Sequence, residues 1–521
     1  MRVSAAEISA IQYMYARGNF AAAEGAARRL LGVAPRVPEL HDILCTSLLH
    51  QGKTEEAEVA YRNAIAAGCN HAEFLNGLGV SLLRLGRAAE AIEVCRGAIK
   101  RNARYWQAYV TLADACVATS RYHDAITAYD RALRLEPNNA PANASLASAL
   151  QSLGRYEDAM AACERALAID PHCAAALSNQ AAALCSLGRA TEAIPLFEAA
   201  IRQVPGRADL HNNLAIAYLS IGAFDKANAS CEQALSLDSG LEAAHLTLAD
   251  IRRREGKLEE AAFHYRAATT AEARGKELEC IYALGNVEQY NARLNEISAT
   301  DTDNRRVAAL DVFASHQRDR VSHYPFCRAP LGYIHHKKTE GLHFGEKVVK
   351  ELLSSDAVWE PPGSSTRSGL QTRQNIFDID VEPVRRLKKV ILNEAEEFFR
   401  RYRNQEDVLI KGRPKKFRLN GWVVNLTAGG HQTPHIHPSG WLSGVYYMRM
   451  PAELDGDEGA IRFGVWGYNY PVQRTPLPCT VYKPSQGDLI LFPSSLFHET
   501  VPFRGEFPRT TLAFDLCPSE G

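Results

Sequence analysis

The sequence lacks any apolar run long enough to cross a membrane, and Met1 to Phe20 lack the basic start and apolar stretch of a secretion signal. An excess of one charge is also missing, because 59 Lys and Arg residues stand against 60 Asp and Glu residues. A balanced charge argues against the broad basic surface with which proteins bind nucleic acids or anionic membranes. We therefore expect a cytoplasmic protein with neither nucleic acid nor membrane as its partner.

The twelve cysteines lack the Cys-x-x-Cys spacing of zinc sites and redox motifs. Several occur singly inside helical apolar patterns, among them Cys95, Cys116 and Cys163. They are interpreted as small core residues of a reduced protein. The chain of 521 residues is too long for a single core, so we expect two or more domains.

A turn residue recurs every 34 residues through the first half of the chain, at Gly18, Gly52, Gly86, Ser120, Gly154, Gly188, Gly222 and Gly256. An alanine follows each turn five residues later, from Ala23 to Ala261, where a small side chain lets two helices pack closely. This period and pattern resemble tetratricopeptide repeats. We expect eight such repeats over residues 1–272, stacked into a superhelix whose concave groove binds a protein or peptide.

Two polar residues and the end of the array complete the helical region. Asn179 and Asn213 occupy the same position in successive repeats. They could bind a peptide backbone, or they could be exposed polar positions without a role. The helical pattern at 275–297 and the polar stretch that follows predict a capping helix and a linker over residues 273–304.

The texture of the sequence changes after residue 304. Helical patterns occupy 345–353 and 381–403, and the stretch 360–373 between them is rich in Pro, Gly, Ser and Thr, which predicts a loop. Short apolar runs separated by Gly and Pro then predict strands at 421–426, 442–448, 460–465, 479–482, 488–492 and 510–516. Such spacing is typical of a jelly roll. We expect a second domain over residues 305–521, with a β core at about 417–516 and bracing helices.

Three histidines and one arginine stand out in this β region. One residue separates His435 from His437, so an extended chain would point both rings to the same side. His498 follows 61 residues after His437, and Arg509 follows eleven residues later. The pattern resembles the iron(II)/2-oxoglutarate-dependent oxygenases, nearest to their prolyl-hydroxylase-like branch. That resemblance implies a double-stranded β-helix, or cupin-like jelly roll, with three metal ligands on one face of the ion.

The resemblance also implies residue roles and cofactors. It assigns metal binding and catalysis to His435, His437 and His498, and 2-oxoglutarate binding to Arg509, Tyr447, Asn425 and Thr511. It implies Fe(II) and 2-oxoglutarate, with dioxygen as the second co-substrate and ascorbate as a reductant. His437 departs from the family, which usually has a carboxylate there; Asp457 or Glu458 could supply one instead. We expect Trp422, Trp441 and Trp466 to be aromatic residues of the core or of the pocket wall, with Trp441 as the best candidate to face a substrate.

These observations lead to one main hypothesis about function. The chain is expected to be a 2-oxoglutarate-dependent dioxygenase, a hydroxylase of a protein or peptide whose local concentration the repeats raise. Two alternatives stay open. The enzyme could hydroxylate a small molecule and use its repeats only for assembly. It could also be a non-catalytic tetratricopeptide scaffold with a degenerate oxygenase domain that has lost turnover through His437.

Overall fold

The computed structural model describes residues 3–354, 357–361, 364–451, 454–505 and 508–519. Contacts divide the chain into two compact units, Met1–Gly206 and Arg207–Gly521. This division lies inside the repeats, at residue 206, and not at the domain boundary expected at residues 273–304. The expected boundary stays a prediction. None of the described helices is both long and apolar enough to cross a membrane.

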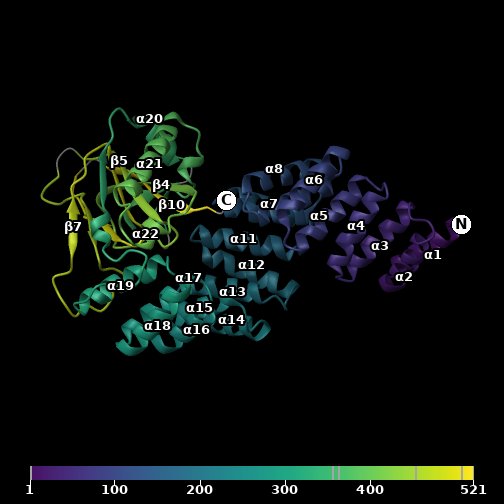
Figure 1. The fold of residues 1–521 in the computed structure, drawn as a ribbon, viewed down its shortest axis with the longest axis horizontal. Helices are drawn as coiled ribbons and strands as arrows, with labels where there is room; N and C mark the ends of the chain where they lie inside the picture. Colours follow the sequence, from purple (N-terminus) through teal and green to yellow (C-terminus); the bar gives the residue numbers. More distant parts are fainter. Residues whose placement is uncertain (1–2, 355–356, 362–363, 452–453, 506–507, 520–521) are drawn as a thin grey trace. The chain divides into compact units, whose positions relative to one another are not determined.

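Helical hairpins make up the described part of the first unit. Their helices lie side by side in the order of the sequence, and a helix contacts its successor and in several cases the helix two further along (Figure 1). The helices are α1 (Ala5–Ala16), α2 (Phe20–Leu31), α3 (Pro38–His50), α4 (Thr54–Ala66), α5 (Ala72–Arg84), α6 (Ala88–Arg101), α7 (Trp106–Ala118), α8 (Tyr122–Leu135), α9 (Ala140–Ser152), α10 (Tyr156–Ile169), α11 (Ala174–Ser186) and α12 (Ala190–Gln203).

The structure confirms the repeats residue by residue. The predicted turn glycines have φ angles of 73° to 78°, and Ser120 has a φ of 56°, so all adopt the left-handed backbone that ends the first helix of a hairpin. The alanine five residues after each turn is completely buried. At Gly79 an added methyl group would lie 2.6 Å from the Cys95 Sγ, which shows how closely neighbouring helices approach. Small residues at fixed places therefore set the helix spacing.

The second unit begins with further hairpins of the same kind, formed by α13 (Ala208–Ser220), α14 (Phe224–Leu237), α15 (Glu242–Arg254) and α16 (Leu258–Ala267). The single capping helix expected over 275–297 is wrong. It is two helices, α17 (Ala271–Ala283) and α18 (Val287–Thr300), because Gly285 turns the chain with a φ of 76° and Asn286 caps the second helix. The helix α19 (Arg305–Gln317) follows.

Two antiparallel sheets form the β domain, in agreement with the predicted fold class. The larger sheet has the order β1-β8-β5-β10-β4-β3-β2, and the smaller has the order β7-β6-β9. The strands are β1 (His335–Lys338), β2 (Val358–Trp359), β3 (Thr366–Gln371), β4 (Phe417–Gln432), β5 (Leu442–Arg449), β6 (Ile461–Gly464), β7 (Cys479–Tyr482), β8 (Asp488–Pro493), β9 (Phe497–Thr500) and β10 (Arg509–Pro518). The loop expected at 360–373 is wrong in part, because it contains β3.

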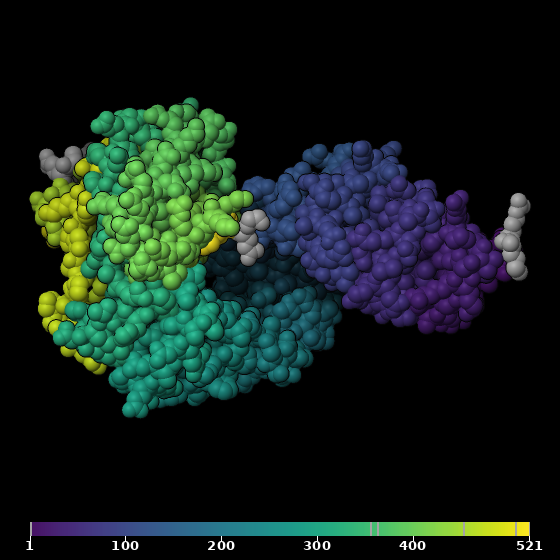
Figure 2. Space-filling model, in the orientation of Figure 1, coloured from purple at the N-terminus to yellow at the C-terminus, as the bar shows by residue number. Residues whose placement is uncertain are grey.

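The two faces of the large sheet have different neighbours. Val445 and Tyr447 of β5 pack with Phe463 of the small sheet, whereas the alternate residue Tyr446 belongs to the core shared with the helices. The helices over this outer face are α20 (Glu346–Ser354), α21 (Glu382–Arg401) and α22 (Val408–Lys411), which are labelled in Figure 1, and the atoms of this stretch are the green ones in Figure 2. Two short 3-10 turns, Pro330–Tyr333 and Ile376–Asp378, complete the domain. The helices thus cover the outer face of the large sheet, and its inner face, toward the small sheet, is where we look for a functional site.

Candidate metal centre and co-substrate pocket

Three histidine rings meet between the two sheets. His435 and His437 follow the end of β4, and His498 lies on β9. The backbones of His435 and His498 pair through two hydrogen bonds of 3.1 Å, which brings together residues 63 positions apart. The ring centroids lie 4.3 to 5.2 Å apart, and one nitrogen of each ring lies within 4.8 Å of the other two. The predicted histidines thus form a cluster that could hold a metal ion.

Each ring donates a hydrogen bond from Nδ1, and the Nε2 atom of His435 also lies 3.3 Å from the Ser365 hydroxyl. His435 Nδ1 donates to the Thr433 carbonyl at 2.7 Å, and His498 Nδ1 donates to the Leu496 carbonyl at 3.2 Å. His437 Nδ1 donates to Asp515 Oδ1 at 2.5 Å. A donor at Nδ1 fixes the tautomer in which Nε2 carries a lone pair. The three Nε2 atoms are therefore the candidate ligand atoms.

Burial keeps two of these rings neutral. Burial, together with the neighbouring His437, lowers the pKa of His435 to about 3. Burial and the charges that His435 and His437 could carry hold the pKa of His498 well below its ordinary value. Metal ligation requires unprotonated imidazoles. At neutral pH these side chains are thus ready to bind a cation without first losing a proton.

Asp515 is a carboxylate that sequence reasoning missed. It lies on β10, it is 4% exposed, and it accepts hydrogen bonds from both His437 and the Ser443 hydroxyl, the latter at 2.6 Å. A signal was present, because an acidic residue interrupts the otherwise apolar run from Leu512 to Leu516. In the family that the sequence resembles, a carboxylate usually binds the metal directly. Here the carboxylate of Asp515 is hydrogen-bonded to the candidate ligand His437 instead.

The two carboxylates considered as substitute ligands lie elsewhere. Asp457 forms an ion pair of 3.1 Å with Lys483, and its side chain is 49% exposed. Glu458 lies 3.9 Å from Arg504. Neither belongs to the histidine cluster of the described residues. Asp515 therefore fits the need for a compensating charge better than either.

Arg509 is completely enclosed, with 1% of its surface exposed. Its Nε donates to the Gly459 carbonyl at 3.1 Å, and its guanidinium lies 5.0 Å from the ring centre of Tyr447. Among the described residues, neither Arg509 Nη1 nor the Tyr447 hydroxyl has a hydrogen-bond partner. Burial lowers the pKa of Arg509, and it raises the pKa of Tyr447 to about 12. An unpaired buried cation is costly, so this arrangement fits an anion that enters from outside.

Strand parity separates the remaining predicted residues. Thr511 pairs with Tyr447 across β10 and β5 and shares its face of β10 with Arg509. Asn425 does not join them. It stands opposite Thr510 in β4, and it accepts a hydrogen bond of 2.7 Å from that hydroxyl on the helix-covered face. A one-residue step along a strand reverses the face, so a position inferred from spacing alone pointed Asn425 the wrong way.

A cavity of about 640 Å³ opens beside His435 and His437. Trp422, Trp466 and Tyr468 form its aromatic part. Hydroxyl and amide side chains form its polar part, from Ser364, Ser365, Gln371, Gln432, Thr433 and Asn469. Apart from Asp515, which His437 and Ser443 already occupy, no carboxylate, Lys or Arg is among the lining residues described for this cavity.

Trp441 does not face this cavity, contrary to expectation. It is 2% exposed, its Nε1 donates to the Leu409 carbonyl at 2.9 Å, and its ring packs edge-on against Phe326. The indole is thus a core residue between sheet and helices. The repeat residue Asn179 is also used internally, since its amide nitrogen donates to the Ala144 carbonyl at 2.8 Å. That bond leaves less of its side chain for a peptide.

Comparison with known families agrees with both regions. A family model described as "Putative 2OG-Fe(II) oxygenase" matches residues 420–515. Models of the tetratricopeptide repeat match residues 44–108, 110–174 and 172–240. The chain thus carries tetratricopeptide repeats in its N-terminal part and a domain of this oxygenase family at its C-terminus. No curated protein sequence matches the chain at a significant level.

Several solved structures match parts of the chain. The APC/C hetero-tetramer Cut9-Hcn1 matches with 16% identity and a TM-score of 0.43, over 53% of this chain and 55% of that chain, so the match spans about half of its length. A repeat protein from Parabacteroides merdae matches with 17% identity and a TM-score of 0.41, over 46% and 97%. A thermophilic repeat protein of Thermus thermophilus matches with 26% identity and a TM-score of 0.32, over 35% and 100%.

Proposed function

We propose that the chain is an iron(II)- and 2-oxoglutarate-dependent dioxygenase that hydroxylates a protein or peptide bound with the help of its repeats. The observation that carries this proposal is the buried guanidinium of Arg509, whose Nη1 lacks a hydrogen-bond partner among the described residues, in the same β sandwich as three converging imidazoles. A histidine cluster alone would fit many metal proteins, and a buried arginine alone would fit many anion sites. Together they match a metal ion and a dicarboxylate bound side by side.

The residues present fit the metal. Imidazole nitrogen suits iron(II), and three ligands from one side leave coordination positions open for a chelating co-substrate and dioxygen. His435, His437 and His498 would hold the ion. The hydrogen bond from His437 to Asp515 orients the ring and brings a negative charge close to the ion, which compensates for the missing carboxylate ligand. Bound iron(II) and 2-oxoglutarate together supply the activation of dioxygen.

The residues around Arg509 fit the co-substrate. Arg509 Nη1 and the Tyr447 hydroxyl would both donate to the distal carboxylate of 2-oxoglutarate, which gives these buried groups the partners they lack. Thr511 lies opposite Tyr447 and can add a third hydrogen bond. Tyr447 packs with Phe463 and Phe492, and the Phe492 ring centre lies 4.6 Å from that of His498. This apolar cluster excludes water from the region between carboxylate and metal.

The cavity favours a polypeptide side chain without charge. Apart from the occupied Asp515, its described lining has no ionised side chain, and its amides and hydroxyls offer hydrogen bonds to a neutral polar group. Tetratricopeptide repeats commonly bind proteins or peptides. A repeat-bound segment would reach the site at a raised effective concentration.

Metal binding and co-substrate turnover test this proposal. We expect the wild-type protein to bind one equivalent of Fe(II) anaerobically and, in air with ascorbate, to convert 2-oxoglutarate to succinate. His498→Ala should abolish both, because it removes a ligand. Asp515→Asn should weaken metal binding by about 10- to 100-fold, because His437 loses its charged partner. His431→Ala is the matched control, because this histidine lies four residues before His435 and outside the cluster.

Metal-independent or absent 2-oxoglutarate binding in the wild type would contradict the proposal and favour the scaffold alternative. The substrate arm uses the full-length protein to capture polypeptides from a lysate, with Fe(II) and 2-oxoglutarate supplied in air. Mass spectrometry then searches the captured proteins for the gain of one oxygen atom that the His498→Ala protein does not produce. Oxygen gain on a small molecule alone would favour the small-molecule alternative.

A further inference from the structure

The segment between β6 and β7 builds one wall of the cavity and rests on helices outside the β domain. Trp466, Gly467, Tyr468 and Asn469 line the cavity. Tyr468 and Asn469 have φ angles of 51° and 58°, a backbone conformation that non-glycine residues keep only when their surroundings hold them. The contacts of this wall must therefore hold its backbone in place.

A buried ion pair lies directly behind the wall. Glu279 of α17 is 8% exposed and accepts from Arg306 Nη1 of α19 at 2.8 and 3.1 Å. Glu279 Oε1 also accepts from the Tyr470 hydroxyl at 3.0 Å. The Arg306 guanidinium lies 4.7 Å from the ring centre of Tyr468. One acid and one base of the helical region thus each contact one tyrosine of the cavity segment.

Further bonds join α19 to the segment between β6 and β7 and to the segment that follows His437. Gln317, at the end of α19, accepts from the backbone N–H groups of Gln473 and Arg474 at 2.6 and 2.7 Å. Arg305, at its start, donates to the Pro438 carbonyl at 2.9 Å, one residue beyond His437. The helix α19 therefore contacts the residue after His437 at one end and the segment between β6 and β7 at the other.

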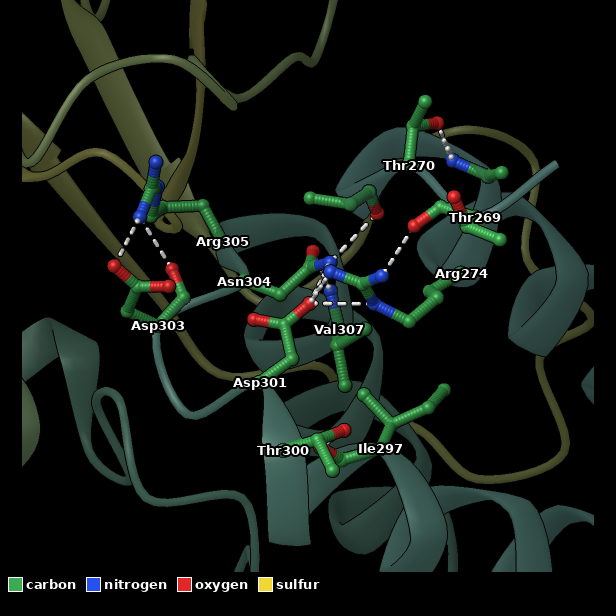
Figure 3. Close-up of polar contacts among 12 residues, drawn as sticks. Thr269, Thr270, Arg274, Ile297, Thr300, Asp301, Asp303, Asn304, Arg305 and Val307 are labelled. Atoms are coloured by element: carbon green, nitrogen blue, oxygen red, sulfur yellow. Dashed lines mark hydrogen bonds and ion pairs between the residues drawn. The ribbon is translucent and has the colours of Figure 1, made fainter. Parts of the chain in front are cut away.

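The helix is itself firmly joined to its neighbours. Figure 3 shows the junction, in which Arg274 of α17 and the Asn304 amide both donate to Asp301 Oδ2, at 2.7 to 3.1 Å. The Asn304 amide also donates to the Ala271 carbonyl at 2.6 Å, and its Oδ1 caps α19 by accepting from the Val307 N–H at 3.2 Å. This network fixes the start of α19 against α17.

We propose that Glu279 and Arg306 are a positioning pair, which holds the Tyr468 wall of the cavity in the shape that receives the substrate. The substrate role of the cavity rests on the proposed function, whereas the positioning does not. In this view the last helical hairpin and α19 hold one wall of the substrate cavity from outside the β domain. A buried pair of this kind is poor as a source of stability, but it fixes a unique arrangement of the groups around it.

The test compares two neighbouring acids on α17. Glu279→Gln keeps the size of the side chain and removes its charge. Glu277→Gln is the matched control, because Glu277 is 1% exposed and forms a similar buried pair, with Arg293 at 2.6 Å, that contacts α18 instead of the cavity wall. We expect amide hydrogen exchange in residues 466–478 to accelerate about tenfold in Glu279→Gln and to stay within twofold in Glu277→Gln. Equal acceleration in both, or none in Glu279→Gln, overturns the proposal.

A second pair of variants separates charge from shape. Arg306→Lys keeps a cation between Glu279 and Tyr468 and should retain slow exchange, whereas the similarly long but uncharged Arg306→Met should exchange as fast as Glu279→Gln. If Lys and Met behave alike, the ion pair does not position the wall. Cobalt(II) binding and substrate-free succinate release should stay within twofold of wild type in Glu279→Gln. Absence of both in the wild type sinks the proposed function and leaves the exchange result standing.

Discussion

The repeats of the first unit and the β domain of the second bury their residues in different ways. In the repeats, the same contact between an alanine and a neighbouring helix recurs, and each hairpin packs mainly on those next to it in the chain. In the β domain the decisive contacts join distant segments, as in the pairing of His435 with His498 and of Asn425 with Thr510. Repeated local contacts thus build an extended helical array, whereas contacts between distant segments build the enclosed histidine cluster.

The buried polar groups of the two regions differ in the same sense. In the described repeats of the first unit a half-buried amide such as Asn179 is satisfied by a carbonyl of the adjacent repeat, and the buried side-chain atoms without a partner belong to imidazole, hydroxyl and amide groups, such as Asn76 Oδ1. In the described β domain Arg509 Nη1 and the Tyr447 hydroxyl lack hydrogen-bond partners at one place. A buried charged atom without a partner costs folding free energy. At Arg509 we interpret this cost as the sign of a ligand that supplies the missing partner.

The largest effect is expected where this contrast is sharpest. Arg509→Gln should weaken 2-oxoglutarate binding about 100-fold, because the charge-assisted hydrogen bond from Arg509 Nη1 and the attraction between guanidinium and carboxylate are lost. The same change should raise the free energy of unfolding of the ligand-free protein by about 1 kcal/mol or more, because an unpaired buried charge disappears. Isothermal titration with 2-oxoglutarate and urea denaturation measure the two.

Loss of stability in Arg509→Gln would break the contrast, since it would mean that the fold itself uses the charge. Metal binding is the internal control and should stay within threefold of wild type, because Arg509 lies outside the histidine cluster.

A smaller effect is expected on the repeat side. Ala125 is completely buried where α8 packs on α7. Ala125→Leu adds three carbon atoms at this contact and should lower the free energy of unfolding by about 1–3 kcal/mol. Metal binding and succinate release should not change. Urea denaturation followed by circular dichroism checks the first part, and a loss below about 0.5 kcal/mol would show that the repeats tolerate larger side chains than their pattern indicates.

The smallest effect concerns pH and belongs to the β domain. The pKa of His435 is lowered to about 3 and that of His498 is lowered well below 6.5, mainly by burial. As the pH falls below 6.5, the unfolded chain takes up these protons before the folded one, so stability is present above that pH and is lost between about 6.5 and 3. The metal-free protein should lose about 1 kcal/mol from pH 7 to pH 6, as thermal unfolding can measure. A His435→Ala, His498→Ala double variant should lose less over the same step.

The sequence predicted the repeats well because their physics is local. A small residue at a fixed interval defines both the turn and the helix contact, so Gly18 or Ala125 can be interpreted without knowledge of the rest of the chain. Prediction weakened where the period ended. The break at Gly285 divided an expected single helix, and β3 appeared inside an expected loop because its partner residues in β4 lie 53 to 66 positions further along the chain.

In the β domain the sequence predicted which histidines meet, but it did not predict what surrounds them. Spacing placed Asn425 among the co-substrate residues, and only the register of β4 against β10 showed that it faces the helices. Asp515 was missed because its partner His437 comes from a segment 78 residues earlier. Trp441 was expected at the cavity and lies in the core, while Trp422 and Trp466 line the cavity instead.

The strand β10 carries Arg509 near its beginning and Asp515 six residues later, on the same face. Under the proposed function Arg509 would bind the co-substrate carboxylate, and Asp515 would orient the candidate metal ligand His437. Because faces alternate along a strand, deletion or insertion of one residue between them would turn one of the two toward the helices. This stretch can therefore change its side chains in the course of evolution but not its length, and homologous proteins with the same site should keep the interval of six even where little else is shared.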